Sequence, residues 1–69
     1  SYQLPQTQSV ELTLYNVLGR RVKSLFQGRQ AAGTHELSIN ASSLSSGVYI
    51  LQLRGEQNLL SRKKITLVK

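Results

Sequence analysis

The chain has 69 residues, with nine Lys or Arg against three acidic residues, a formal net charge of +6 and no cysteine. Its length permits a single domain, which buries roughly 60% of the surface of its unfolded chain. Without cysteine it has neither a disulfide nor a thiolate metal site, so its apolar core must stabilise it alone. The positive charge favours anionic partners such as nucleic acid, lipopolysaccharide, acidic glycans or an acidic protein surface, unless it serves only solubility and the protection of strand edges.

Two kinds of targeting segment are missing from the sequence. No apolar run approaches the ~18 residues of a membrane-spanning helix. The amino terminus lacks the basic, apolar and small-residue zones of a signal peptide. If the protein is exported, we therefore expect this chain to be a downstream piece of a longer precursor.

Alternation of apolar and polar side chains predicts β-strands in the first part of the chain. Ser1–Leu4 is expected to form a short strand, which Pro5 ends or confines to a sheet edge. The next strand has one apolar face, formed by Val10, Leu12 and Leu14. Asn16–Gly19 has the residue types of a tight turn, in which Gly19 can adopt a positive φ.

The segment after this turn is less regular. Arg20–Gln27 is predicted to be a strand with Val22 as its clearest core residue. Leu25 and Phe26 are adjacent, so either one of them faces outward or a β-bulge intervenes. Gly28–Gly33 is expected to be a polar loop with a glycine at each end.

The middle of the chain contains a further alternating stretch and a polar connection. Thr34–Asn40 is predicted to be a strand whose apolar face holds His35, Leu37 and Ile39. Asn40 and Ser42 can then form a tight turn through hydrogen bonds from side chain to backbone. Leu44 is the lone apolar residue of the polar stretch and is expected to close the end of the core from a short helical turn.

The last part of the chain predicts a hairpin. Gly47 is expected to start a strand that continues over Val48–Arg54, where apolar residues on both faces indicate a central strand. Gly55–Asn58 is the predicted hairpin loop, and Leu59–Val68 is the predicted last strand. In that strand we expect Ile65 and Leu67 to point inward, with Lys64 and Thr66 outward.

These elements together predict an all-β fold. Five clear strands and one shorter strand follow one another at a spacing of roughly 8–12 residues, which is typical of an antiparallel sandwich. No stretch has the pattern of an amphipathic helix. The whole chain, residues 1–69, is expected to be one domain.

The residues needed for catalysis or metal binding are not present in a suitable pattern. His35 is the only histidine, and no Asp or Cys accompanies it. The three carboxylates, Glu11, Glu36 and Glu56, are expected on outward strand positions and in a loop, where they are solvated. The glycines of Gly28–Gly33 lack the Lys-Ser/Thr of a phosphate-binding loop. The sequence therefore predicts no enzyme, no cofactor and no metal site.

The strongest basic cluster is Arg62-Lys63-Lys64, near the carboxyl end of the chain. On a strand it would either protect an edge by charge or form a strip that faces an anion. Nucleic-acid binding would be helped by aromatic side chains beside the basic residues, and the three tyrosines and one phenylalanine lie elsewhere. We therefore do not expect a nucleic-acid partner.

Four phrases in a fixed order resemble a known family. They are the segments VELTLYNVLGRRV, GTHEL, LSSGVYILQL and RKKITLVK. In this order they resemble the type IX secretion (Por) C-terminal sorting domain, type A, over nearly the whole chain. They are also similar to the Ig-like domain of flagellar hook-capping proteins. The first phrase has Asn16 where the family usually has Asp, which preserves a hydrogen-bonded turn and removes a charge.

The resemblance implies a fold, a function and partners. It implies a small Ig-like β-sandwich of about six to seven strands at the carboxyl end of a larger cargo protein. The cargo would pass through the periplasm, and the type IX translocon would take it across the outer membrane to the cell surface or the extracellular space. A sortase-like peptidase would remove the domain and attach the cargo at the surface.

The resemblance also suggests which residues the translocon recognises. Mapped onto the matching phrases, and with the basic last strand taken as an exposed edge or surface, they are Gly19, Arg20, Gly47, Tyr49, Lys63, Lys64 and Lys69. Family members often begin with a Pro-Asn-Pro-Phe segment, and this chain starts at Ser-Tyr-Gln-Leu-Pro. We therefore expect the extreme amino-terminal segment to lie outside this chain, leaving an edge at which two copies could associate weakly.

Two other functions remain open on the sequence alone. One is a structural or accessory Ig-like module of a secreted cell-surface enzyme. The other is a carbohydrate-binding module, which the small number of aromatic side chains and the absence of tryptophan make less favourable.

Overall fold

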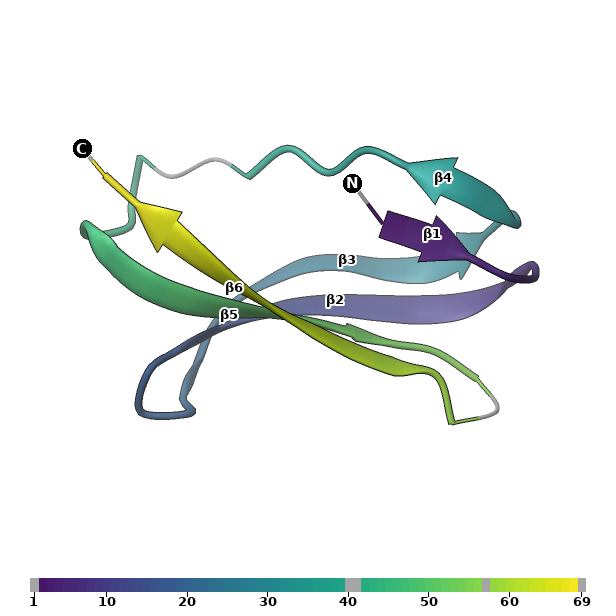
Figure 1. Cartoon of the computed structure of the whole chain (residues 1–69), viewed down its shortest axis with the longest axis horizontal. Helices are drawn as coiled ribbons and strands as arrows, with labels where there is room; N and C mark the ends of the chain where they lie inside the picture. Colours follow the sequence, from purple (N-terminus) through teal and green to yellow (C-terminus); the bar gives the residue numbers. More distant parts are fainter. Residues whose placement is uncertain (1, 40–41, 57, 69) are drawn as a thin grey trace.

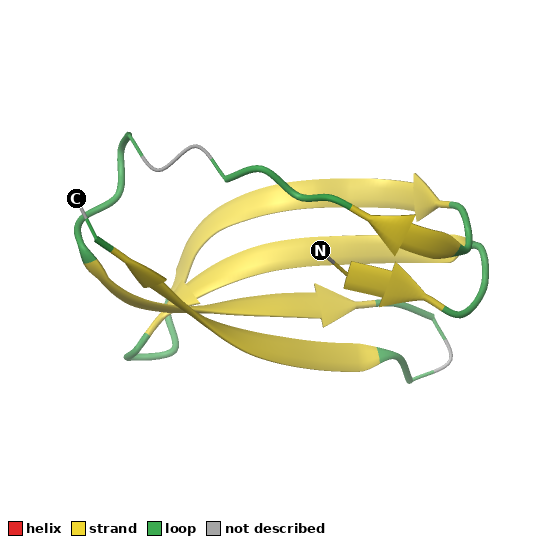
Figure 2. Cartoon of the chain, turned by 45° about the horizontal axis from the view of Figure 1, so that its top comes forward, coloured by secondary structure: helices red, strands yellow, loops and turns green. Residues whose placement is uncertain are grey.

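The computed structural model describes residues 2–39, 42–56 and 58–68, and this part of the chain forms six strands. The strands are β1 (Tyr2–Leu4), β2 (Gln8–Asn16), β3 (Arg21–Gln30), β4 (Gly33–His35), β5 (Gly47–Arg54) and β6 (Leu60–Leu67). Figure 2 shows strands and loops without any helix among these residues. Accordingly, no helix that could span a membrane occurs in the described part of the chain.

The strands form two layers. Four of them make a sheet in the order β3-β2-β5-β6, and β1 pairs with β4 in a smaller sheet. All of these pairings are antiparallel. Leu4 of β1 packs against Val10, Leu12 and Leu53 of the larger sheet, so the small sheet covers part of one of its faces (Figure 1). The predicted all-β antiparallel sandwich is confirmed.

The core is built on the inward face of β2, as the alternation of its residues predicts. Leu12 and Leu14 are fully buried. Cross-strand pairing places Leu53 opposite Leu12 and Leu51 opposite Leu14. β5 lies between β2 and β6, so the predicted central strand is confirmed.

Two connected groups of buried side chains make up this core. One contains Leu4, Val10, Leu12 and Leu53, and the other contains Leu14, Leu44 and Tyr49. Leu44 closes the second group, as predicted from the sequence. It does so from a non-helical turn, so the expected helical turn is wrong.

Strand β3 contains two irregularities, and they decide which of its side chains reach the core. Leu12 pairs with Phe26 and the next residue of β2 pairs with Ser24, so Leu25 is the extra residue of a bulge. The bulge lets Leu25 and Phe26, although adjacent, both pack against the core. This confirms the second of the two sequence-based alternatives.

The second irregularity overturns one prediction. Leu14 pairs with Lys23 and Tyr15 pairs with Arg21, so Val22 is skipped in the register. Val22 is 37% exposed and is not the clearest core residue of this strand. The prediction failed because a residue skipped in the pairing does not keep the inward orientation that strict alternation would give it.

The predicted loop Gly28–Gly33 is largely strand. β3 continues to Gln30, with Gly28 opposite Val10, and β4 begins at Gly33. Gly28 has a φ of 156°, a conformation that side chains disfavour. The backbone conformation of β3 at this position therefore explains a glycine that looked like a loop residue.

The strand predicted over Thr34–Asn40 is shorter than expected. β4 ends at His35. The residues that follow are not part of a strand, although Leu37 and Ile39 still pack against the core. The turn expected at Asn40 and Ser42 falls partly outside the described residues. The last strand agrees with its prediction to within one residue at each end, with Ile65 and Leu67 half-buried and Lys64 and Thr66 exposed.

His35 has a structural environment. Its ring stacks on that of Tyr2, with centroids 5.4 Å apart and planes 26° apart. Its Nε2 donates a hydrogen bond to the carbonyl oxygen of Ala31 over 2.6 Å. Burial raises the pKa of the Tyr2 hydroxyl in the same contact. His35 therefore joins β4 to β1 at the rim of the small sheet.

Gln8 is a buried polar residue whose role the sequence did not reveal. Its Oε1 accepts a hydrogen bond from the backbone N–H of Glu56 over 2.9 Å, and its Nε2 donates to the carbonyl oxygen of Gln6. The Glu56 carboxylate in turn accepts from the backbone N–H of Ser9 over 2.8 Å. These contacts attach the β5–β6 connection to the start of β2.

The central position of Leu12 gives a first testable prediction. Leu12→Ala removes a fully buried side chain and should lower the free energy of unfolding by about 2 to 5 kcal/mol, measured by urea denaturation. The matched control is Leu18→Ala, because Leu18 is 76% exposed at a turn and should change stability by about 0.5 kcal/mol or less. Equal losses in the two variants would contradict the assignment of the core to the inward face of β2.

The contact between Gln8 and the β5–β6 connection gives a second prediction. A Cβ at Gly55 would lie 2.5 Å from Oε1 of Gln8 and 2.8 Å from Cδ2 of Leu59. Gly55→Ala should therefore lower the free energy of unfolding by about 1 to 3 kcal/mol, measured by urea denaturation. Combining it with Gln8→Ala, which removes one of the clashing groups, should cost less than the sum of the two single changes. If the losses of stability in the two single variants simply added up in the double variant, the contact between Gln8 and the position of Gly55 would be contradicted.

Candidate recognition surface

Three phrases that are far apart in the sequence meet at one end of the sandwich. Asn16 at the end of β2 pairs with Tyr49 of β5, and Tyr49 pairs with Ile65 of β6. Gly47 at the start of β5 pairs with Leu67. Figure 1 shows the β2–β3 turn, the start of β5 and the end of β6 together at the left of the molecule. Antiparallel register, not proximity in the chain, assembles this surface.

The β2–β3 turn is held by the side chain of Asn16. Its Oδ1 accepts hydrogen bonds from the backbone N–H groups of Leu18 over 2.9 Å and Arg20 over 3.0 Å. The N–H of Gly19 donates to the carbonyl oxygen of Asn16 over 3.0 Å, and Gly19 has a φ of 81°. This left-handed conformation favours glycine. The turn predicted at this phrase is confirmed.

The tip of this turn displays apolar side chains to solvent. Val17 is 69% exposed and Leu18 is 76% exposed. The cations Arg20 and Arg21 follow directly and are exposed too. A rigid turn with an apolar tip and a basic base offers a shape and a charge that a protein partner can contact.

The second phrase is organised around Tyr49. Its ring is 8% exposed, and its hydroxyl donates a hydrogen bond to the carbonyl oxygen of Ser45 over 2.7 Å. Gly47 has a φ of 152°, a conformation that side chains disfavour, where the chain enters β5. Tyr49 and Gly47 therefore fix the course of the segment that contains Leu44.

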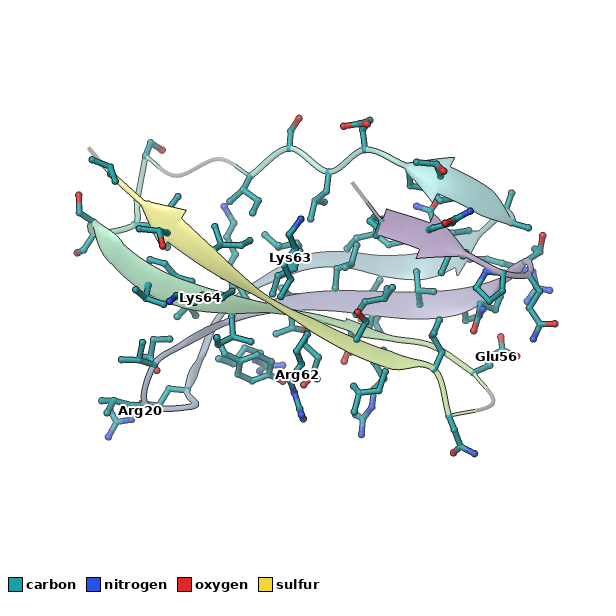
Figure 3. All side chains as sticks on the ribbon, viewed as in Figure 1. Arg20, Glu56, Arg62, Lys63 and Lys64 are labelled. Atoms are coloured by element: carbon teal, nitrogen blue, oxygen red, sulfur yellow. The ribbon has the colours of Figure 1, made fainter. Side chains whose placement is uncertain are left out.

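The cations of β6 point to both sides of the sheet. Lys63 lies opposite Leu51 and is on the core side, at the open margin of the sandwich. Arg62 and Lys64 are on the opposite side, because side chains alternate along a strand. Figure 3 shows Lys63 and Arg62 on opposite sides of β6, with Arg20 on the side of Arg62.

An open groove of about 410 Å³ lies on the outer side of the large sheet, between the β2–β3 turn and Arg62. Its lining residues come from three strands and the turn, and include Tyr15, Val17, Gly19, Ile50, Gln52 and Arg62. The Nε of Arg62 donates a hydrogen bond to Oε1 of Gln52 over 3.0 Å, which orients the guanidinium. Sequence reasoning did not find this groove, although the outward parity of Tyr15 and Ile50 on neighbouring strands was a signal for it.

The basic residues of this surface have no acidic partners in the described part of the chain. The ion pair found there joins Arg29 and Glu56 over 3.8 Å, and it lies near the β5–β6 connection, at the other end of the sheet. The β2–β3 turn and β6 therefore carry positive charge that no carboxylate of the described residues pairs with, and such charge favours an anionic partner surface.

The predicted recognition residues occupy two neighbouring regions. Gly19, Arg20, Gly47 and Tyr49 are at the end where the phrases meet, while Lys63 and Lys64 lie further along β6. Lys69 falls outside the described residues. Within the described residues no group of histidines and carboxylates could hold a metal ion.

Comparison with known protein families identifies the class to which this fold and surface belong. The chain matches the family described as the secretion system C-terminal sorting domain over residues 1–68, and it belongs to that family. It is a C-terminal sorting signal for the type IX secretion of a cargo protein. The domain is thus attached to a cargo, is handled by the secretion machinery and directs export to the cell surface or the extracellular space. No curated protein and no solved structure gave a significant match.

The hydrogen bonds of Asn16 yield a third prediction. Asn16→Ala removes both bonds from Oδ1 and should lower the free energy of unfolding by about 1 to 2 kcal/mol. Asn16→Asp keeps an oxygen acceptor, and a charged acceptor forms stronger hydrogen bonds, so at neutral pH this variant should be at least as stable as the unchanged chain. Urea denaturation of both variants measures the difference. Equal destabilisation by the two changes would show that Oδ1 does not hold the turn.

Proposed function

We propose that this domain is a non-enzymatic sorting signal that the type IX translocon recognises in its folded form. The recognition surface is the end of the sandwich where the β2–β3 turn and the start of β5 meet β6, together with the basic side chains of β6. The residues of this surface are Gly19, Arg20, Gly47, Tyr49, Lys63, Lys64 and Lys69.

The observation that supports the proposal is the convergence of the three phrases through strand register. Asn16 and Gly19 shape the turn, and Tyr49 lies between the ends of β2 and β6. Unfolding would separate these segments by more than 30 residues of chain between Asn16 and Tyr49. A surface composed in this way exists only in the folded domain, so a partner that binds to it recognises the folded state.

The residues divide into two roles under this proposal. Gly19, Gly47 and Tyr49 set the backbone shape, because two have unusual φ angles and the third is buried. Arg20, Lys63 and Lys64 supply exposed positive charge that steers and orients a partner with an acidic surface.

The remaining partners and the route follow from the same role. The cargo precedes this domain in the precursor, with residues 1–69 as the sorting unit. The precursor crosses the periplasm before the translocon engages it. A sortase-like peptidase then separates the cargo from the domain and attaches it to the outer surface.

Secretion of a reporter tests the basic part of this surface. A periplasmic reporter fused to the chain should reach the cell surface or medium in a host with type IX secretion. The double variant Lys63→Gln with Lys64→Gln should reduce its export at least about tenfold, because two exposed cations of β6 that orient the translocon are lost. The measurement is the external fraction of the reporter, with folding of the variant verified by circular dichroism.

The control removes the same charge at a different place. Arg29→Gln with Arg54→Gln changes the net charge equally and leaves the converging phrases intact. Export that falls equally in both double variants would contradict local recognition. A reporter that stays in the periplasm with the unchanged chain would favour a structural module of a cell-surface enzyme.

A further inference from the structure

The two edges of the large sheet differ in regularity. β3 forms one edge, and two register shifts interrupt its pairing with β2. β6 forms the other edge and pairs with β5 through eight consecutive residue pairs, from Gly47 with Leu67 to Arg54 with Leu60. Bulges impede the addition of a further strand, and a regular edge permits it. β6 is therefore the edge that is geometrically able to extend the sheet.

The far side of β6 is accessible. Within the described residues, β6 has β5 as its strand neighbour and no strand on the other side. The side chains from Leu60 to Lys64 are exposed. An edge strand presents unpaired backbone N–H and C=O groups, which an extended segment can satisfy by β-augmentation.

The charges along β6 define what kind of segment fits. Arg62 and Lys64 are on one side of the sheet and Lys63 is on the other. A strand paired with β6 would therefore have one cation opposite each of three successive residues. Two of these cations are on one side of the sheet and one is on the other. Cross-strand neighbours are about 4.5–5.5 Å apart at Cβ, so carboxylates at those three positions would be paired.

The same charges disfavour a second copy of this chain as the occupant. Antiparallel pairing of two β6 strands about Lys63 would place Lys63 opposite its own copy and Arg62 opposite Lys64. In-register parallel pairing would bring each cation close to its copy. Like charges on facing strands are destabilising, so the basic triplet excludes self-pairing while it attracts an acidic strand.

The core side of β6 adds an apolar requirement. Beyond Lys63, the residues on this side are Ile65 and Leu67, and both are half-buried. A small open hollow of about 110 Å³ adjoins Lys63 and Ile65. It is lined by Tyr2, Leu37, Ile39, Leu51, Lys63 and Ile65. An apolar residue of the added strand, next to the acidic triplet and two positions from the carboxylate opposite Lys63, would lie on this face and cover Ile65.

We propose that β6 adds a strand supplied by an extended acidic segment of a protein partner, with carboxylates at three successive positions against Arg62-Lys63-Lys64 and an apolar residue against Ile65. This rests on the proposed function in taking β6 as part of the surface that the secretion machinery contacts. It goes further by naming the conformation and the chemistry of the partner segment.

A synthetic peptide tests the proposal on the purified chain. The peptide carries three consecutive glutamates flanked on each side by alternating valine and threonine, with a valine next to the glutamates at each end, so that a valine faces Ile65 in either direction of the added strand. On addition of the peptide, the amide protons of Leu60–Leu67 that face away from β5 should gain protection from exchange, measured by NMR, while those of β3 stay unchanged. Binding should weaken as salt is raised, because the paired charges are near the surface.

Backbone methylation separates strand addition from attraction by charge alone. Two versions of the peptide are N-methylated at alternate amides, so each keeps all charges and loses the donors of one edge. Strand addition predicts that one version binds and the other does not. Equal binding of the two versions would overturn the proposal.

Matched charge variants locate the binding edge. Arg62→Gln, Lys63→Gln and Lys64→Gln together should weaken peptide binding at least about tenfold. Arg21→Gln, Lys23→Gln and Arg29→Gln together remove the same charge from β3, at the other edge, and should leave binding within about twofold. Equal weakening in both triple variants, or protection that rises with chain concentration without peptide, would overturn the proposal.

The result is independent of the secretion assay. Failure of the peptide to bind β6, with export still dependent on Lys63 and Lys64, would sink strand addition and leave the proposed recognition surface standing. Failure of export to depend on these residues would instead contradict the proposed function.

Discussion

Burial of the inward face of β2 is the interaction on which the rest of the structure depends. Leu12 and Leu14 are fully buried and link the two parts of the core. The chain has no cysteine and no metal site among its described residues, so apolar burial must offset the conformational entropy of a short chain. β3 and β5 are positioned by their register on β2, and β6 is positioned by β5.

This dependence ties the sorting surface to the core. Tyr49 contributes to the buried cluster around Leu14, and its backbone pairs with both Asn16 and Ile65. The turn and the end of β6 are therefore held by the same residues that stabilise the sandwich. If the proposed recognition surface is the one contacted, recognition is coupled to folding, because loss of core packing would also separate its segments.

The two edges of the large sheet differ in what limits their pairing with further strands. β3 is irregular, and its bulges limit pairing with other strands. β6 is regular and carries three consecutive cations, which protect it from its own copies while keeping it attractive to acidic surfaces.

The sequence by itself determined the strands, their inward faces and the family phrases, because period-two alternation and turn residues act over a few neighbouring positions. It correctly predicted that the side chains of Leu12 and Leu44 belong to the core and that a turn forms at Asn16. It failed at Val22 and Gly28, since the residue skipped in the pairing and the continuation of β3 to Gln30 both depend on how β3 pairs with β2. Only the tertiary structure decided that the phrases meet at one end, that Gln8 holds the β5–β6 connection and that β6 is a regular edge, because strand order and register arise from packing between residues distant in the chain.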